Sequence, residues 1–167
     1  MKKDTINFID LFCGAGGFAK GFEMTGKFKC IGGIDNKPSA IETHKHNFKN
    51  SVSICDDIRK VPPEDFDKLL NGKKVDLIIG GPPCPTFSTI GHAKIQSVYK
   101  SHDDKDITND PRNDLFLDFF GYVDYFRPKM FVMENVPQFL TKYKGATFNA
   151  VKEIIKTLNI FWQNERY

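Results

Sequence analysis

The sequence lacks the features that define several large classes of protein. It has no apolar run near the roughly 18 residues of a membrane span, and its start shows no signal-peptide pattern. Its four cysteines form no CxxC pair, which excludes the common zinc and iron–sulfur spacings, and its four histidines show no ligand spacing either. We therefore expect no metal site and no membrane partner. Free thiols in a reducing cytoplasm are the simple interpretation of the cysteines.

A strong charge of either sign is also absent. The 167 residues carry a net charge of +3, which is too small and too evenly spread to indicate a nucleic-acid partner by itself. Hydrophobic residues make up 40% and charged residues 27%, as in ordinary globular proteins, and 16 phenylalanines can fill a core. This length and composition predict one domain over residues 1–167.

Apolar runs typical of strands alternate with segments of helical spacing. The expected strands are 6–12, 30–35, 51–54, 75–81 and 129–135, and the expected helices are 16–26, 37–48, 62–72, 110–126 and 146–158. This alternation predicts βαβ units, whose right-handed crossovers give an α/β fold with a doubly wound, mostly parallel sheet. Such sheets bind ligands beyond the carboxyl ends of their strands, so the residues that follow each strand are the candidates for a site.

Glycines and acidic residues follow the first three expected strands. The stretch DLFCGAGGF (10–18) lets the backbone approach a ligand, although such glycines serve equally to pack a helix on a sheet. It matches neither the dinucleotide fingerprint nor a P-loop. Asp35 ends the second strand, where an acid typically accepts hydrogen bonds from ribose hydroxyls. Asp56 and Asp57 follow the third strand, and each alone is more often a helix cap. Together the acids predict a nucleoside ligand.

A cysteine between prolines follows the fourth expected strand, in GGPPCPTFST (80–89). Pro83 and Pro85 restrict the backbone on both sides of Cys84, although most free cysteines are simply buried. Glu134 ends the fifth strand, which is expected beside the fourth, so Cys84 and Glu134 should face one site. No histidine lies at a strand end to activate the thiol for proteolysis. The pair instead suits thiolate addition to an aromatic ring while an acid protonates a ring nitrogen.

Together these stretches resemble the amino-terminal half of the cytosine-C5 DNA methyltransferase family. FIDLFCGAGGF, GGIDNKPSAI and DDI match its first three motifs, and GGPPCPTFSTIG, DPRNDLFLDFF and MENVPQFL match later ones, in order over residues 6–140. The resemblance implies a Rossmann-like, S-adenosylmethionine-dependent methyltransferase fold. It also implies methyl transfer from S-adenosyl-L-methionine to C5 of a cytosine that is flipped out of double-stranded DNA.

The resemblance assigns roles to individual residues. It implies that Cys84 is the nucleophile, Glu134 the acid at N3 of the ring, and Ser88 a contact to DNA or cofactor. Asp35 would hold the ribose of the cofactor, and Asp57 with Ile58 would read its adenine. The other cofactor residues that it implies are Phe12, Gly14, Gly16, Asn36, Pro83 and Leu115.

The sequence departs from the family pattern at its carboxyl end. The Gln-Arg-Arg motif, the target-recognition region and the terminal helix of the family have no counterpart up to Tyr167. We therefore expect a sheet truncated at its C-terminal side, with an unpaired edge at 129–135, and a second polypeptide that supplies target recognition. A shortened gene fits equally well.

Three functional interpretations stay open. The intact motifs favour a DNA methyltransferase of a restriction-modification system, weak or inactive without its missing half, in a prokaryotic cytoplasm and at the nucleoid through DNA. A tRNA cytosine-C5 methyltransferase of the same fold and a catalytically inactive fragment that binds S-adenosylmethionine are the alternatives.

Overall fold

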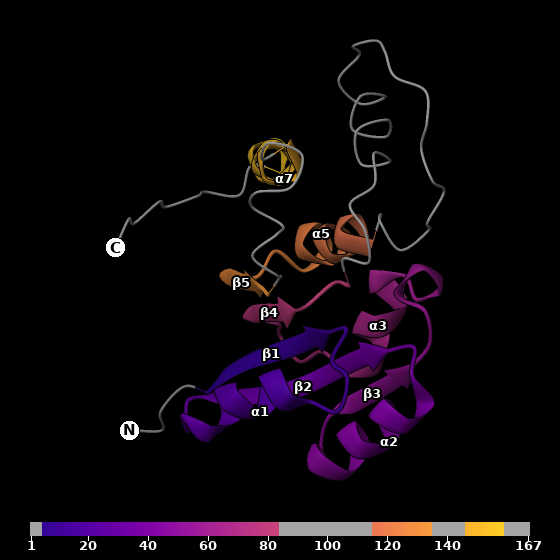
Figure 1. Cartoon of the computed structure of the whole chain (residues 1–167). Coiled ribbons are helices and arrows are strands. Elements are labelled where there is room, and N and C mark those ends of the chain that lie inside the picture. The colour runs from indigo at the N-terminus through magenta and orange to yellow at the C-terminus, as the bar shows by residue number, and fades with distance from the viewer. Residues whose placement is uncertain (1–4, 84–114, 135–145, 159–167) are drawn as a thin grey trace. The chain divides into compact units, whose positions relative to one another are not determined.

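The computed structural model describes residues 5–83, 115–134 and 146–158. The chain divides into two compact units, one of Met1–Pro83 with Leu115–Glu134 and the other of Cys84–Asp114 with Asn135–Tyr167. All the described strands belong to the first unit (Figure 1). In the second unit the structure describes helix α7 (Ala146–Thr157), where Val151 and Ile155 are buried one turn apart. A single domain over the whole chain stays a prediction.

The first unit is built on a parallel five-stranded sheet, which confirms the predicted fold class. Its strands are ordered β3-β2-β1-β4-β5, and every neighbouring pair is parallel. The order reverses between β1 and β4, because the chain first builds outward to β3 and then crosses back. β4 and β5 are neighbours as predicted, and β5 is an edge strand of the described sheet. The strands are β1 (Ile6–Leu11), β2 (Phe28–Asp35), β3 (Val52–Cys55), β4 (Leu77–Gly80) and β5 (Met130–Met133).

Helices cover both faces of this sheet (Figure 1). Two glycines of β2 mark the faces, because successive residues of a strand point to opposite sides. A methyl group on Gly33 would meet His44 on one face, and one on Gly32 would meet Phe66 on the other. The first face carries α1 (Gly17–Met24) and α2 (Pro38–Asn47), and the second carries α3 (Pro63–Leu70) and α5 (Leu115–Phe126).

The helix boundaries follow signals in the sequence to within a few residues. Pro38 lies in the first turn of α2, where its missing N–H breaks no helical hydrogen bond. α3 ends at Leu70 and is capped by Asn71, which adopts the left-handed region at φ 52°, one residue before the predicted stop at Gly72. The structure adds η1 (Ile58–Lys60), a 3-10 helix that the sequence pattern did not predict. Three residues are too few to show a helical period.

Aromatic side chains fix the helices to the sheet. On one face the Phe22 ring contacts Phe8 and Phe28, with centroids 5.7 and 5.1 Å apart. On the other face the Phe119 ring lies 6.1 Å from that of Phe131, which joins α5 to the edge strand β5. Aromatic contacts at these distances add to the stabilisation from burial. The contact between Phe119 and Phe131 helps to hold β5, and therefore Glu134 at its end, against the rest of the unit.

Gly16 offers a test of this packing. It caps α1 with φ 89°, and a methyl group there would lie 2.2 Å from the Phe48 ring. We expect Gly16→Ala to lower the free energy of unfolding by more than about 2 kcal/mol, because it adds overpacking to a strained backbone.

Gly17→Ala is the matched control, because a methyl group on Gly17 meets nothing within 4 Å. It should change the free energy of unfolding by less than about 1 kcal/mol. Urea unfolding of both variants measures the difference, and equal losses would contradict the packing assigned to Gly16.

Candidate functional site

The carboxyl ends of β1, β2 and β3 bring the predicted nucleoside-binding residues to one edge of the sheet. The Gly14 N–H, in the turn after β1, donates to Asp35 Oδ2 at 2.9 Å. Asp35 is paired with Cys55 across β2 and β3, and its carbonyl accepts from the Asp56 N–H at 3.1 Å. Asp57 follows directly. Three segments that are separate in sequence therefore meet where a parallel sheet binds its ligands.

The Asp35 carboxylate joins two turns at this edge. Its Oδ2 accepts from the Gly14 N–H and its Oδ1 from the Lys37 N–H, both at 2.9 Å. A carboxylate oxygen has two acceptor positions, so one remains on each oxygen. Asp35 is thus held in place while keeping capacity for two further donors.

The turn between β1 and α1 combines backbone strain with an open backbone surface. Phe12 has φ 63°, a conformation that is rare for a bulky side chain and that clusters at functional sites. Gly14 has φ 53°, and a methyl group there would meet nothing within 4 Å, whereas Gly16 packs against Phe48. The sequence left two uses open for these glycines, close approach to a ligand and packing of a helix, and each position serves one of them. Gly16 lets the helices pack, and Gly14 leaves open space beside its backbone.

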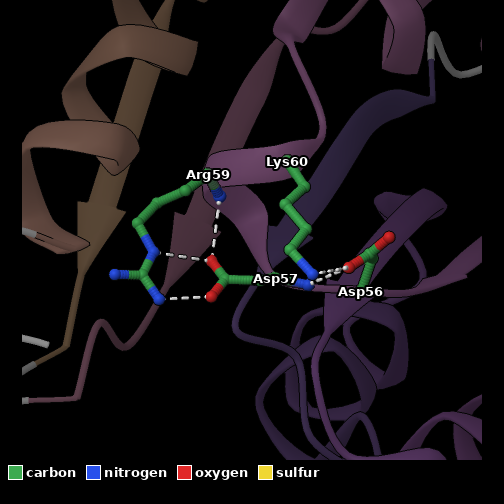
Figure 2. A network of polar contacts seen from close by, with 4 residues as sticks. All are labelled: Asp56, Asp57, Arg59 and Lys60. Atoms are coloured by element: carbon green, nitrogen blue, oxygen red, sulfur yellow. Dashed lines mark hydrogen bonds and ion pairs between the residues drawn. The ribbon is translucent and has the colours of Figure 1, made fainter. Parts of the chain in front are cut away.

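Asp57 is held by its neighbour Arg59 (Figure 2). Its Oδ1 accepts from the Arg59 backbone N–H at 3.0 Å, which caps η1, and from Arg59 Nε at 2.9 Å. Its Oδ2 accepts from Arg59 Nη2. The guanidinium hydrogen bonds lower the pKa of Asp57 to about 2, so the carboxylate is ionised at neutral pH. The sequence analysis missed Arg59, although an arginine two residues after a capping aspartate is a readable signal.

The other predicted cofactor residues of the first unit differ in exposure. The Ile58 side chain is buried, so any ligand contact would come from its backbone N–H, which has no partner within the first turn of η1. Asn36 and Pro83 are exposed, and Leu115 is buried at the start of α5. Their contacts with a cofactor stay predictions.

The ends of β4 and β5 place Glu134 beside the segment that leads to Cys84. The Glu134 N–H donates to the Gly80 carbonyl at 2.9 Å. A methyl group on Gly81 would lie 2.9 Å from Glu134 Oε2, so the carboxylate approaches that backbone closely because Gly81 has no side chain. Cys84 and Ser88 lie outside the described residues, and the juxtaposition of Cys84 with Glu134 stays a prediction.

Two other cysteines are unsuited to nucleophilic chemistry. Cys13 and Cys30 are free and buried, and Cys55 is free and exposed. Burial raises the pKa of the Cys30 thiol to about 12 and also raises that of Cys13. Because the thiolate is the reactive form, these two buried thiols are inert at neutral pH.

Metal-binding clusters and membrane-spanning helices are absent from residues 5–83, 115–134 and 146–158. Within them, no group of three or more histidine, cysteine, aspartate or glutamate side chains is arranged to hold a metal ion. Nor does any helix there combine the length and apolar character that crossing a bilayer requires.

Two buried polar side chains lie under the α1–α2 face and were not assigned to the site from the sequence. Asp10 is 1% exposed, and its Oδ2 has no hydrogen-bond partner. His44 Nδ1 lies 2.7 Å from Ser53 Oγ, while its unpartnered Nε2 faces Gly33. Burial, with the charge of Asp35 adding to it, raises the pKa of Asp10 to about 7, and burial lowers the pKa of His44. The signal for Asp10 was one acid inside the apolar run INFIDLF.

The sheet order and the acids at its strand ends are those of a Rossmann-like fold. The family model for C-5 cytosine-specific DNA methylases matches residues 6–162, and the chain belongs to this family. It is 41% identical over 150 residues to the type II methyltransferase M.DdeI of Desulfomicrobium norvegicum, covering 90% of this chain and 32% of that protein. It is 35% identical over 154 residues to M1.HphI of Haemophilus parahaemolyticus, covering 92% of this chain and 38% of that protein.

Solved structures show the same fold. A protein encoded within an E. coli prophage and described as a DNA modification methyltransferase matches with a TM-score of 0.71 and 27% identity, over 92% of this chain and 38% of that one. A mutant of DNMT2 from Spodoptera frugiperda matches with a TM-score of 0.64 and 26% identity, over 93% of this chain and 42% of that one. The family resemblance and the fold are confirmed, and the chain spans about a third to two fifths of the length of these relatives.

The raised pKa of Asp10 predicts a pH dependence of stability. The folded protein keeps this proton up to about pH 7, whereas the unfolded chain releases it near pH 4. The folded state therefore binds more protons in this window, and the contribution of Asp10 to stability falls as pH rises from about 4 to about 7. Asp10→Asn removes the ionisation, so we expect the variant to gain stability relative to the unmodified protein over that range.

The gain should be at most about 1.4 kcal/mol per pH unit. Urea unfolding of both proteins at several pH values measures it, and two parallel curves of stability against pH would exclude the ionisation of Asp10 as a cause.

Proposed function

We propose that this chain is the cofactor-binding and catalytic half of a DNA cytosine-C5 methyltransferase that uses S-adenosyl-L-methionine and serves a type II restriction-modification system. The single observation that carries the proposal is the meeting of Gly14, Asp35 and Asp57 at the carboxyl edge of a methyltransferase sheet. Membership of the family and the type II methyltransferases among its relatives support it.

The described residues fit this cofactor. Asp35 keeps one acceptor position on each oxygen, which matches the two hydroxyls of a ribose. The ionised Asp57 is an acceptor for an amine such as that of adenine, and the open backbone at Gly14 admits a ligand. When bound, S-adenosylmethionine supplies an electrophilic methyl group on a sulfonium. The site would be completed by Phe12, Gly16, Asn36, Ile58, Pro83 and Leu115.

Cys84 and Glu134 would act on the cytosine ring. The Cys84 thiolate adds to C6, and the new C–S bond pushes ring electrons toward N3, where the Glu134 carboxyl group donates a proton. This addition makes C5 nucleophilic. Once C5 carries the methyl group as well as its proton, a base would remove that proton and the C–S bond would break. N3 would return its proton to Glu134, which restores the aromatic ring, the thiolate and the carboxyl group. The cytosine must leave the DNA stack for these steps, and Ser88 would contact DNA or cofactor.

Double-stranded DNA is the proposed substrate. We propose that target recognition comes from residues outside these 167. The alternative of a tRNA substrate is less favoured, because the matching family and the two relatives compared above are named for DNA or type II methyltransferases. An inactive fragment would bind S-adenosylmethionine as the proposed enzyme does, but it would transfer no methyl group.

Transfer of labelled methyl from S-adenosylmethionine to mixed-sequence DNA, with cofactor binding measured on the same sample, tests the proposal. We expect methyl transfer when this chain is combined with the residues that supply target recognition. The Cys84→Ser variant should lose this transfer, because a serine hydroxyl is a poor nucleophile for C6. Cofactor affinity should be unchanged in that variant. Transfer by Cys84→Ser would exclude Cys84 as the nucleophile, and absence of cofactor binding in the unmodified chain would overturn the proposal.

Asp35→Ala tests the ribose contact. We expect the affinity for S-adenosylhomocysteine, measured by calorimetry, to fall about 10-fold or more, because hydrogen bonds to a charged acceptor are lost. Asp56→Asn is the matched control, because it removes a neighbouring exposed charge but keeps the oxygen that accepts from the Asp57 N–H at 2.7 Å. It should change the affinity little. An equal loss in both variants would indicate an effect of charge rather than a ribose contact.

A further inference from the structure

The proposed function assigns the Asp57 carboxylate to adenine, and N–H groups of Arg59 fill most of its acceptor positions. A carboxylate has about four acceptor positions, two on each oxygen. On Asp57, Oδ1 already accepts from the backbone N–H and the Nε of Arg59, and Oδ2 accepts from Nη2 (Figure 2). One position remains, and it lies on Oδ2.

We propose that Arg59 is a positioning residue that holds Asp57 so that its one remaining acceptor position receives a single N–H of the cofactor's adenine amine. This assignment rests on the proposed function and extends it to a residue outside the family motifs that the sequence analysis used. Arg59 acts through Asp57, and no contact between Arg59 and the cofactor is part of the proposal.

The arrangement fixes the carboxylate from several sides. The planar guanidinium binds it through two N–H groups, which restricts its orientation as well as its position. The turn that carries both residues is itself anchored, because Ile58 is buried and the Lys60 N–H donates to the Asp57 carbonyl at 2.8 Å. The Tyr122 hydroxyl donates to the carbonyl of Val61 at 2.7 Å, which ties the end of η1 to α5.

The adjacent acid shows what the arginine adds. Asp56 lies at 4.0 Å from Lys60 Nζ, and the two side chains are 48% and 73% exposed. The Asp57 side chain is 23% exposed and that of Arg59 is 41% exposed. Asp56 Oδ1 also accepts from the Asp57 backbone N–H at 2.7 Å, whereas its exposed pair with Lys60 holds the side chain weakly. The chain therefore carries two neighbouring carboxylates, of which one is fixed by a fork and the other is not (Figure 2).

A fixed, ionised carboxylate can discriminate between purines. An amine at the exocyclic position donates to it, whereas a carbonyl at that position would place an acceptor against an acceptor. The low pKa of Asp57 prevents the carboxyl from gaining a proton and becoming a donor. The two guanidinium N–H groups of Arg59 prevent the carboxylate from turning away. A purine with a carbonyl at this position therefore leaves polar groups unpaired. Such unpaired groups are the strongest basis for rejecting an analogue.

Calorimetric titration of the full chain with S-adenosylhomocysteine and with S-inosylhomocysteine tests this role. The measured quantity is the ratio of the two dissociation constants, inosine over adenine. We expect the ratio to be about 10 or more in the unmodified protein and to fall toward one in Arg59→Ala. A variant that merely loosened the fold would weaken both ligands equally and would leave the ratio unchanged.

Two further variants separate geometry from charge. Arg59→Lys keeps the positive charge but loses the fork, so its ratio should also fall, and it serves as a second test if Arg59→Ala folds poorly. Lys60→Ala removes the neighbouring cation, which is close to Asp56 rather than to the Asp57 carboxylate, and should keep the ratio of the unmodified protein.

The outcomes distinguish this assignment from the proposed function. If the unmodified chain bound neither ligand, the proposed cofactor and the role of Arg59 would both be overturned. If it bound both ligands with a ratio near one, the cofactor would stand and the reading of the amine by Asp57 would be wrong. If the ratio in Arg59→Ala and Arg59→Lys equalled or exceeded that of the unmodified protein, Arg59 would not position Asp57.

Discussion

The carboxylate of Asp35 is the interaction on which the proposed cofactor edge depends. It accepts one N–H from the glycine turn after β1 and one from the start of α2. The backbone carbonyl of Asp35 accepts from the Asp56 N–H after β3. Hydrogen bonds from backbone N–H groups to a carboxylate are among the stronger ones in proteins. The pairing of these three parallel strands therefore fixes the relative positions of the Gly14 backbone, the Asp35 carboxylate proposed for ribose and the Asp57 carboxylate proposed for adenine.

The site extends across the point where the strand order reverses. Of the proposed cofactor residues, Gly14, Asp35 and Asp57 lie at or after the ends of β1, β2 and β3, whereas Glu134 follows β5 on the other side of β4. The ends of β1 and β4 approach so closely that a methyl group on Gly80 would lie 2.3 Å from the Leu11 carbonyl oxygen. Glycines at positions 80 and 81 therefore permit both the strand contact and the approach of the Glu134 carboxylate. Doubly wound sheets place ligands at this reversal, and the proposed chemistry needs cofactor and acid on its two sides.

Within the described residues, the face under α1 and α2 contains two buried polar atoms without hydrogen-bond partners. Asp10 Oδ2 and His44 Nε2 are buried without partners, and Gly33 and Gly16 leave only enough room for the His44 and Phe48 rings. Unpaired buried polar atoms destabilise a fold, so the aromatic contacts around Phe22 and Phe119 must offset them. Strain of this kind, with the left-handed Phe12, is typical of segments that a protein keeps for function rather than for stability.

The sequence alone determined the strands, the helices and the residues that follow each strand, because local hydrophobic period, glycines and prolines encode them. It also determined the family, because the motifs around Asp35, Cys84 and Glu134 occur in a fixed order. Only the tertiary structure decided that Gly16 packs while Gly14 stays open, that Asp35 joins two turns, and that Arg59 holds Asp57. The physical reason is that strand order, burial and most hydrogen-bond partners arise from contacts made through space, which a local pattern does not record. The Arg59–Asp57 contact is local, but only the structure shows that the guanidinium turns toward the carboxylate.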